Sequence, residues 1–459
     1  MAEIDFDHET DILVVGYGFA GAAAAVEAAE AGAQVLIVEK MPDPGGISIC
    51  SAGSARSAKD ADAAFDYLKQ TNAGRTPDDV LRVLADGMAG IEEYMKWLTG
   101  SLGLSVSSNL SRVRAGANYP MPGWDTFYHT LVDEIPGFDA EAAYPQVSGL
   151  AGGRRLFHVL EQAIAARDIE IWLESPVSRL LSRGEAGEGE VLGVEVAREG
   201  KQVRVRASKG VVLACGGFEC DEETKRQFWQ MQPVLPVMGR QNTGDGLRMA
   251  QSMGARLWHM WHFHGSYGFS PPEDEFPYGI RMKRLPDWVP GEDETSRAQM
   301  SWILVDGGGK RFMNEMPPYT QDISARTFEM FDSTIQDFPR IPAHMICDEA
   351  GLAMYGLGDV CYNERGLDYP WSDDNQAEVQ SGIIKKASDV GELAQIMGAD
   401  EKILEATLDR WNASCDTESD TEFGRMPGSF TPVRTPPYYT APIWPLVSNT
   451  QGGPVHNAR

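Results

Sequence analysis

The sequence predicts an α/β fold in which a largely parallel sheet forms one domain and a second domain is inserted into the chain. Residues 11–40 carry the first evidence: an apolar strand runs into a glycine-rich turn, a helix follows, and a second strand ends at Glu39. Further strands over 169–217 extend the sheet. From about His259 the alternation of strand and helix stops, which predicts a separate domain.

The turn itself, Gly16-Tyr17-Gly18-Phe19-Ala20-Gly21, is typical of a site for a dinucleotide. Gly16 permits the tight turn, Gly18 lets the backbone approach a pyrophosphate, and Gly21 allows the helix to pack closely on the strand. The start of the helix then presents unpaired N–H groups to the phosphates. Glu39, 23 residues after Gly16, suits the ribose hydroxyls of the adenosine and disfavours the 2′-phosphate of NADP.

The pattern after Glu39 predicts the rest of this domain. A helix is expected over 76–98, with Thr76 as its N-cap and Pro77 at its first position. Residues 101–148 are rich in glycine, proline and aromatic residues and are expected to form long loops near the site. Regular structure returns as a helix over 154–168, strands over 169–177, 189–200 and 201–208, and a buried strand that ends at Gly216-Gly217.

The domain boundaries follow from where the alternation of strands and helices starts and stops. Residues 1–258 are expected to form the nucleotide-binding domain, 259–430 the inserted domain, and 431–459 a return to the first domain that looks incomplete. Within the insertion, 301–315 predicts a hairpin and 399–412 a helix.

Charge and cysteine content limit the partners and the compartment. Forty basic and 67 acidic residues give a net charge of −27, which argues against a nucleic-acid or anionic membrane partner. The six cysteines lack the spacing of a disulfide framework, and the N-terminus lacks an apolar signal segment. No run is long enough to span a membrane. We therefore expect a cytoplasmic protein.

Several segments together resemble the FAD-dependent fumarate reductase and 3-ketosteroid dehydrogenase superfamily. They occur in the order of that family and span most of the chain: GYGFAG with Glu39-Lys40, the Gly45-Gly46 loop, SPVSRLL, GVVLACGGF, NTGDGLRMAQSMGA, VDGGGKRFMNE, LDRWN and PPYY…NTQGG. The resemblance implies a Rossmann-like FAD-binding domain with an inserted α+β capping domain that holds the substrate. In that family the chain normally continues beyond the final Gly-Gly to close the cofactor site, so the end at NTQGGPVHNAR is a departure.

The resemblance implies non-covalent FAD, because no histidine stands in the loop from Gly45 to Gly53 where succinate dehydrogenases attach their flavin. The cofactor-binding residues that it implies are Gly16, Gly18, Phe19, Ala20, Gly21, Glu39, Lys40, Gly45, Gly46, Ser48, Val177, Ala214, Gly216, Gly217 and Asp245. No metal is expected, although His259, His262 and His264 have a spacing that metal sites also use.

The two branches of the family differ in the residues that act on the substrate. Fumarate reductases carry a Thr-Arg-Asp unit whose arginine donates the proton. This chain has Thr320-Gln321-Asp322, and a glutamine is no general acid. It matches instead the Asn-Glu-x-x-Pro-Tyr of the 3-ketosteroid dehydrogenases at 314–319. That match implies Tyr319 as the base, Tyr439 as the donor to the carbonyl, and Tyr144 as a supporting hydrogen-bond donor.

The expected reaction is hydride transfer between the flavin N5 and a carbon–carbon bond adjacent to a carbonyl, with a small apolar polycyclic compound, an enone or an enoate as substrate. An aromatic wall suited to such a ligand is expected from Trp258, Trp261, Phe263, Tyr267, Phe269 and Tyr278. Two alternatives stay open: a fumarate-reductase-type enoate reductase, and a flavin-binding or electron-transfer subunit whose substrate site is incomplete. The electron acceptor or donor is not identified by the sequence.

Overall fold

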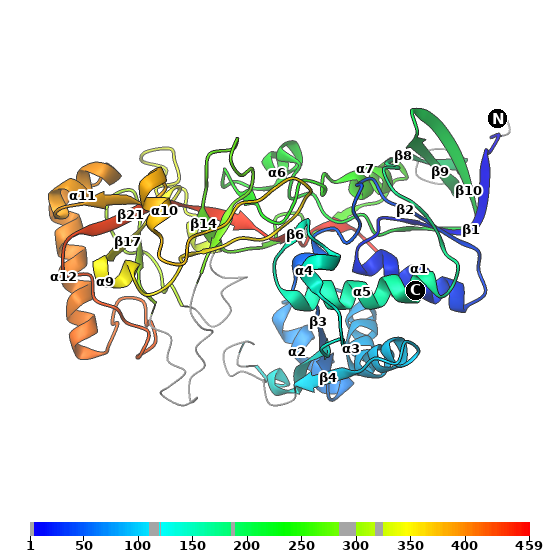
Figure 1. Ribbon diagram of the computed structural model, residues 1–459, viewed down its shortest axis with the longest axis horizontal. Coiled ribbons are helices and arrows are strands. Elements are labelled where there is room, and N and C mark those ends of the chain that lie inside the picture. The colour runs from blue at the N-terminus through cyan, green and yellow to red at the C-terminus, as the bar shows by residue number, and fades with distance from the viewer. Residues whose placement is uncertain (1–3, 110–118, 120, 185–188, 284–299, 317–324) are drawn as a thin grey trace.

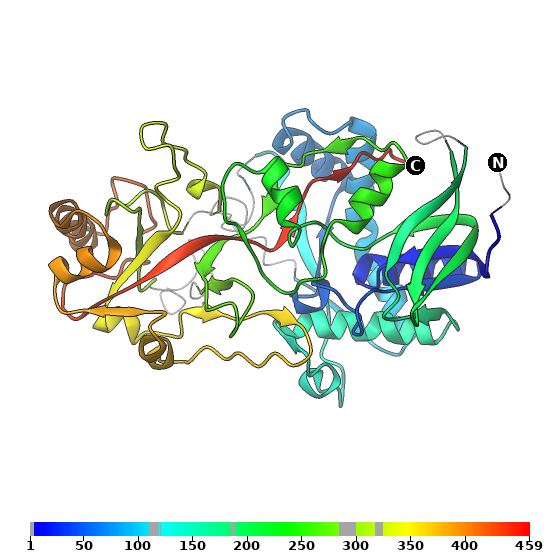
Figure 2. The same ribbon diagram turned by 90° about the horizontal axis from the view of Figure 1, so that it is seen from above.

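The computed structural model describes residues 4–109, 119, 121–184, 189–283, 300–316 and 325–459. It is an elongated molecule with one sheet toward each end, and both chain termini lie at the end that holds the first sheet (Figures 1 and 2). No helix among these described residues is long and apolar enough to cross a membrane.

The first sheet has the strand order β7-β2-β1-β10-β9-β8. Strand β1 (His8–Val15) runs parallel to β2 (Val35–Val38) on one side and to β10 (Lys201–Leu213) on the other. The two strands expected at 201–208 and before Gly216 are thus one long strand. The remaining strands are β7 (Glu170–Trp172), β8 (Val177–Arg183) and β9 (Glu190–Arg198), of which β8 and β9 are antiparallel.

Helices α1 (Phe19–Glu30) and α5 (Ala151–Ala165) lie together beside this sheet (Figure 1). Their apolar residues share one buried cluster with β1 and β2, including Ala25, Val26, Phe157 and Leu160. Helix α3 (Asp78–Gly100) confirms the helix expected at 76–98, but it begins at Asp78 with Pro77 as its N-cap, so Thr76 lies before the cap. Other helices of this half are α2 (Ala61–Thr71), α4 (Ala140–Ala143) and the short η1 (Ser48–Cys50) and η3 (Trp124–Thr126).

The expectation of long loops over 101–148 is wrong for part of that stretch. Strand β5 (Phe127–Val132) pairs with β3 (Ser54–Ala58) on one side and with β4 (Val106–Asn109) on the other, in a three-stranded antiparallel sheet. These strands carry many serine, threonine and histidine residues, so they lack the apolar alternation that marks a strand. Pairing stabilises them instead: β5 pairs with β3, far away along the chain, and β4 pairs with β5.

The second sheet has the order β16-β17-β21-β14-β15-β18, with β11 and β20 also paired to β21. Its strands are β11 (Leu235–Pro236), β14 (Tyr267–Phe269), β15 (Ile280–Met282), β16 (Ile303–Val305), β17 (Ala343–Asp348), β18 (Gly358–Asp359), β20 (Lys385–Ala387) and β21 (Tyr438–Val447). Helices α11 (Val390–Met397) and α12 (Glu401–Thr417) cover its far end (Figure 1). Helices α6 (Glu222–Phe228), α9 (Glu349–Leu352), α10 (Gln376–Ser381) and η5 (Ala325–Phe328) complete this part.

Strand β21 runs along the length of the second sheet and leads back toward the first (Figure 2). Residues 438–447 therefore belong to the second sheet, while the domain boundaries expected from the sequence stay predictions. Short strand pairs follow there: β13 (Phe263–His264) with β22 (Asn449–Thr450), and β12 (Leu257–Trp258) with β23 (Gly453–Pro454). A third pair, β6 (Val147–Ser148) with β19 (Tyr362–Asn363), joins the two halves of the chain.

Candidate functional site

A cleft opens at the carboxyl ends of β1 and β2, where the glycine-rich turn meets helix α1. Gly16 has φ +103°, and a Cβ there would lie 2.5 Å from the carbonyl oxygen of Ala214. A Cβ on Gly21 would lie 2.0 Å from the carbonyl oxygen of Gly16. Only glycine therefore fits at either position, and the start of α1 can approach the sheet edge closely.

Gly18 is the N-cap of α1 and supplies no side chain to cap the first amides of the helix. A Cβ on Gly18 would project toward Ser48, whose Oγ would be 3.5 Å away across the cleft. The missing side chain thus leaves open the space between the helix start and the loop that holds Ser48. Exposed amides and the positive end of the helix dipole meet in this space, as binding of a pyrophosphate requires.

Glu39 directly follows β2 with its carboxylate in the cleft wall, and only 9% of the residue is exposed. Its Oε2 accepts a hydrogen bond from the Tyr17 N–H at 2.9 Å, and its Oε1 accepts one from the Met41 N–H at 2.8 Å. A carboxylate can accept about four hydrogen bonds. The two that remain suit the two hydroxyls of a ribose, which is the role expected from the sequence.

Lys40 and Asp245, 205 positions apart, form an ion pair at the same end of the cleft. The Lys40 Nζ donates to the Asp245 carboxylate at 2.7 Å and to the Thr243 hydroxyl at 2.9 Å. Asp245 is the first residue of helix α7 (Asp245–Ser252) and also pairs with Arg248. The bridge therefore fastens the start of α7 beside the end of β2, and both predicted residues line the cleft.

Twelve of the 15 predicted cofactor residues line this cleft: Gly16, Gly18, Phe19, Ala20, Glu39, Lys40, Gly46, Ser48, Val177, Ala214, Gly216 and Asp245. Gly21, Gly45 and Gly217 lie behind it, where they permit close packing. A Cβ on Gly45 would lie 2.9 Å from the Ile49 side chain, and one on Gly217 would lie 2.0 Å from the Thr450 hydroxyl. The roles of these residues toward a bound cofactor stay predictions.

The prediction omits Gln241 and Asn242, which also line the cleft and directly precede the TGDG segment. The Asn242 amide donates to Oε1 of Glu219, a fully buried acid, at 2.5 Å. Burial raises the pKa of Glu219, while the bond from Asn242 opposes that effect. An aligned acid and amide thus support the cleft wall from behind, at positions that only the tertiary fold brings together.

The three predicted catalytic tyrosines are not brought together within the described residues. Tyr319 lies outside those residues. Tyr439 is buried in β21, and its hydroxyl donates to Glu349 at 2.5 Å. Tyr144 is buried beside α5, and its hydroxyl donates to Glu161. Neither Tyr439 nor Tyr144 lines the cleft, and their catalytic roles stay predictions.

Burial, reinforced by these carboxylates, raises the pKa of both tyrosines. Of the predicted aromatic wall, Trp258 and Trp261 are exposed, while the other four rings are core residues. The Nδ1 of His262 lies 3.3 Å from the Nε2 of His259, but the described part of the chain shows no group of three residues arranged to hold a metal.

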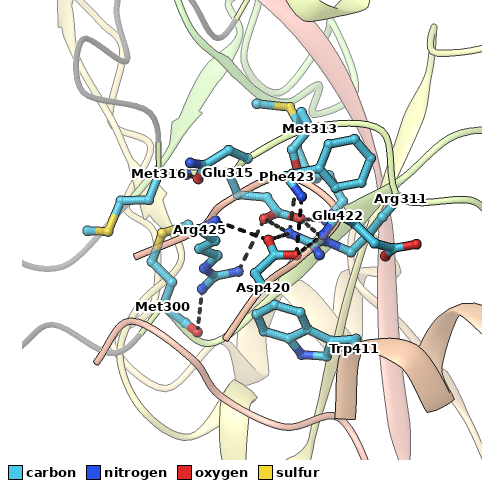
Figure 3. Close-up of polar contacts among 12 residues, drawn as sticks. Met300, Arg311, Met313, Glu315, Met316, Trp411, Asp420, Glu422, Phe423 and Arg425 are labelled. Carbon is cyan, nitrogen blue, oxygen red and sulfur yellow. Dashed lines mark hydrogen bonds and ion pairs between the residues drawn. The ribbon is translucent and has the colours of Figure 1, made fainter. Parts of the chain in front are cut away.

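A second polar cluster, distant from the cleft, fixes the segment that leads to Tyr319 (Figure 3). Glu315 is fully buried and accepts from Arg311 at 2.8 Å and from Arg425 at 3.4 Å, while Arg311 also pairs with Asp420 at 3.0 Å. Both guanidinium groups lie over the ring of Trp411. Two cations and two anions are therefore paired inside the second domain, and the carboxylate of Glu315 has a structural role.

Comparison with known proteins shows which family and which relatives the chain resembles. Residues 11–458 match the family described as FAD binding domain. A 4-oxocyclohexanecarboxylate 2-dehydrogenase of Sinomonas cyclohexanicum is 28% identical, over 90% of this chain and 75% of the relative. A digoxin reductase of Eggerthella lenta is 26% identical, over 99% of this chain and 79% of the relative.

A crystal structure of 3-ketosteroid Δ1-dehydrogenase from Sterolibacterium denitrificans has the same fold. Its TM-score is 0.80 at 19% identity, over 98% of this chain and 90% of that one. The residues of the cleft fit FAD. The open space at Gly18 and the uncapped start of α1 suit its pyrophosphate, and the free acceptor positions of Glu39 suit its ribose.

Proposed function

Because the chain belongs to the FAD binding domain family, we propose that this FAD-dependent oxidoreductase acts on a carbon–carbon bond next to a ketone, in the manner of a 3-ketosteroid dehydrogenase. FAD, when bound, supplies a ring that accepts or donates hydride. The chain's own residues hold the cofactor, orient the substrate and move the proton.

The observation that carries this proposal is the structural role of Glu315. Its carboxylate is enclosed by Arg311 and Arg425, so it is not available to a substrate. Proton transfer then falls to the residues that follow it along the chain, where this sequence has Tyr319 and the non-acidic Gln321. A tyrosine at 319, with glutamine at 321 in place of the arginine of a Thr-Arg-Asp unit, favours removal of a proton next to a ketone over protonation of a small dicarboxylate.

In this proposal Glu39 holds the adenosine ribose, the amides at the start of α1 hold the pyrophosphate, and Tyr319 accepts the proton. Tyr439 as donor to the carbonyl and Tyr144 as a supporting donor are weaker proposals, because their hydroxyls already bond Glu349 and Glu161. A backbone N–H or another side chain is then needed to polarise the carbonyl.

An anaerobic titration tests the proposal. The purified protein, reconstituted with FAD, is mixed with 4-androstene-3,17-dione while the flavin absorbance is recorded. Bleaching of the oxidised flavin supports the dehydrogenase. Reoxidation of the reduced flavin by fumarate, with no bleaching by the ketone, would overturn it.

A second candidate is an enoate or enone reductase, which uses the same site in the opposite direction. The similarity to a digoxin reductase over nearly the whole chain favours it. A neutral enone would then reoxidise the reduced flavin faster than any ketone reduces the oxidised flavin, which the same titration measures.

A further inference from the structure

A fully buried acid, Glu219, lies behind the wall of the cofactor cleft and takes no part in the proposed reaction. It stands in the segment between β10 and α6 (Figure 1), three positions after Gly216, which lines the cleft. A Cβ on Gly216 would lie 2.3 Å from the Asn242 Oδ1, and one on Gly217 would lie 2.6 Å from the Glu219 Oε2. These glycines thus bring the carboxyl and its amide partner directly against the backbone that forms the wall.

The carboxyl of Glu219 is incompletely bonded. Its Oε1 accepts from the Asn242 amide at 2.5 Å, but its Oε2 has no hydrogen-bond partner among the described residues. No ion pair joins Glu219 to any residue of the described ranges either. Lys225, the cation whose charge acts on it, bonds the Glu222 carboxylate and the Val234 carbonyl instead. A buried carboxylate without a paired cation is costly, so burial raises the pKa of this carboxyl and favours its protonated form.

The other titratable groups around this wall already have partners or hold their protons firmly. Glu39 accepts two backbone N–H bonds, and Asp245 forms its ion pair with Lys40. Burial, together with the neighbouring Glu219, raises the pKa of the Cys220 thiol to about 12. Glu219 is therefore the acid whose charge state a ligand in the cleft can change most readily.

A bound dinucleotide changes the electrostatic environment of this carboxyl. The pyrophosphate of FAD is negatively charged. Gly16, in the turn where the pyrophosphate is expected to bind, packs against Ala214, two positions before Gly216. In a protein interior, a negative charge disfavours a second negative charge nearby. FAD therefore favours the protonated form of Glu219 more strongly than the protein without cofactor does.

We propose that FAD binding is coupled to the uptake of a proton by the Glu219 carboxyl, so that the cofactor binds more weakly as pH rises. No proton is taken up where the carboxyl is already protonated without FAD, or where it is ionised with and without FAD. Between these limits the affinity falls by at most about tenfold per pH unit, the limit for one proton. The coupling concerns the cofactor site alone, so it holds whichever carbon–carbon bond the flavin oxidises.

Isothermal titration calorimetry of the full chain with FAD tests the coupling. The binding enthalpy is measured in two buffers with different ionisation enthalpies, and the difference gives the number of protons taken up. Between about pH 5 and 9 the wild type should take up a proton, and its FAD affinity should fall in the same interval. Glu219→Gln, which keeps the shape of the side chain but cannot ionise, should lose both the uptake and the fall in affinity. Glu223→Gln, on the exposed face of α6, is the control and should behave like the wild type.

Absence of proton uptake in the wild type would overturn the proposal. Equal uptake by the wild type and Glu219→Gln would also overturn it, even if the variant bound FAD more weakly, because Glu219 would then only shape the wall. If Glu219→Gln binds no FAD, infrared difference spectra decide. A protonated-carboxyl band that grows when FAD binds to the wild type, and that is displaced in Glu219→Asp, supports the proposal, and its absence overturns it. Proton uptake at Glu219 without bleaching of the flavin by a ketone would refute only the proposed function.

Discussion

The carboxylate of Glu39 shows how one side chain can both build a site and prepare it for a ligand. Its bonds to the Tyr17 and Met41 amides fix the turn after β1 to the end of β2. The acceptor positions that remain are held still in the cleft wall, so little entropy is lost when a sugar binds. The negative charge of the same carboxylate also repels a 2′-phosphate on the ribose.

Tyr319 is the residue on which the proposed chemistry depends. Tyr319→Phe should lower turnover of a 3-ketosteroid by about 100-fold or more, which is the usual contribution of a general base. Flavin content should not change, because Phe keeps the ring and removes only the hydroxyl. Steady-state kinetics measure turnover, and the flavin spectrum of the same preparation measures flavin content. Tyr439→Phe, which removes the hydroxyl of another predicted tyrosine, is the matched variant. Unchanged turnover would remove Tyr319 from the mechanism.

His344 in β17 should make stability depend on pH. Burial, assisted by the nearby Lys385, lowers its pKa to about 4, whereas an unfolded histidine titrates near 6.5. Between these values the unfolded chain binds more protons, so the free energy of unfolding falls as pH drops from about 6.5 toward 4.

Urea unfolding at several pH values measures this dependence. His344→Gln should flatten the curve in that window, while the exposed His456→Gln should leave it unchanged. An equally steep curve in His344→Gln would show that another group is responsible.

The turn between β1 and α1 is the element that should decide cofactor affinity. Gly16→Ala places a Cβ 2.5 Å from the Ala214 carbonyl at a φ of +103°, a strain of about 1–3 kcal/mol that weakens FAD binding. Gly87→Ala, in the exposed middle of α3 with no atom near the new Cβ, is the matched control. It should stabilise the protein by about 0.5–1 kcal/mol and leave FAD affinity unchanged. Equal FAD affinity in both variants would contradict this account of the turn.

The buried cluster around Glu315 should have a large effect on the free energy of unfolding. Glu315→Gln leaves Arg311 and Arg425 facing each other with only Asp420 to compensate them, a cost of about 3–5 kcal/mol. Glu405→Gln, on the exposed face of α12, is the control and should change the unfolding free energy by less than about 0.5 kcal/mol. Chemical denaturation measures both, and similar values for the two variants would contradict the structural role.

Some elements were predictable because their signals are local. The strand, glycine turn, helix and terminal acid over 8–39 follow one another along the chain, and each residue type reports its own conformation. β4 and β5 gave no such signal, because these polar strands acquire their stability from pairing: β5 with the distant β3, and β4 with β5. Gln241 was missed for the same reason: only the tertiary fold brings it into the wall of the cleft.

At the scale of the whole molecule, the long strand β21 leads from the second sheet toward the first, and the short pair of β6 with β19 joins the two halves of the chain (Figure 2). The sequence pattern predicted two domains and one nucleotide-binding site. It did not place Tyr439, whose partner Glu349 lies 90 positions away and holds the hydroxyl in the core of the second sheet. Residue motifs thus located the cleft, whereas the position of Tyr439 depends on contacts that form only in the folded second sheet.

The most direct test of the central claim is the mass of the product. The FAD-loaded protein is incubated with 4-androstene-3,17-dione and an artificial electron acceptor, and the steroid is analysed by mass spectrometry. The account predicts a product with two hydrogens fewer, about 2 Da lighter, that forms only when FAD and the acceptor are both present. An unaltered steroid in the presence of a fully loaded flavin would contradict it.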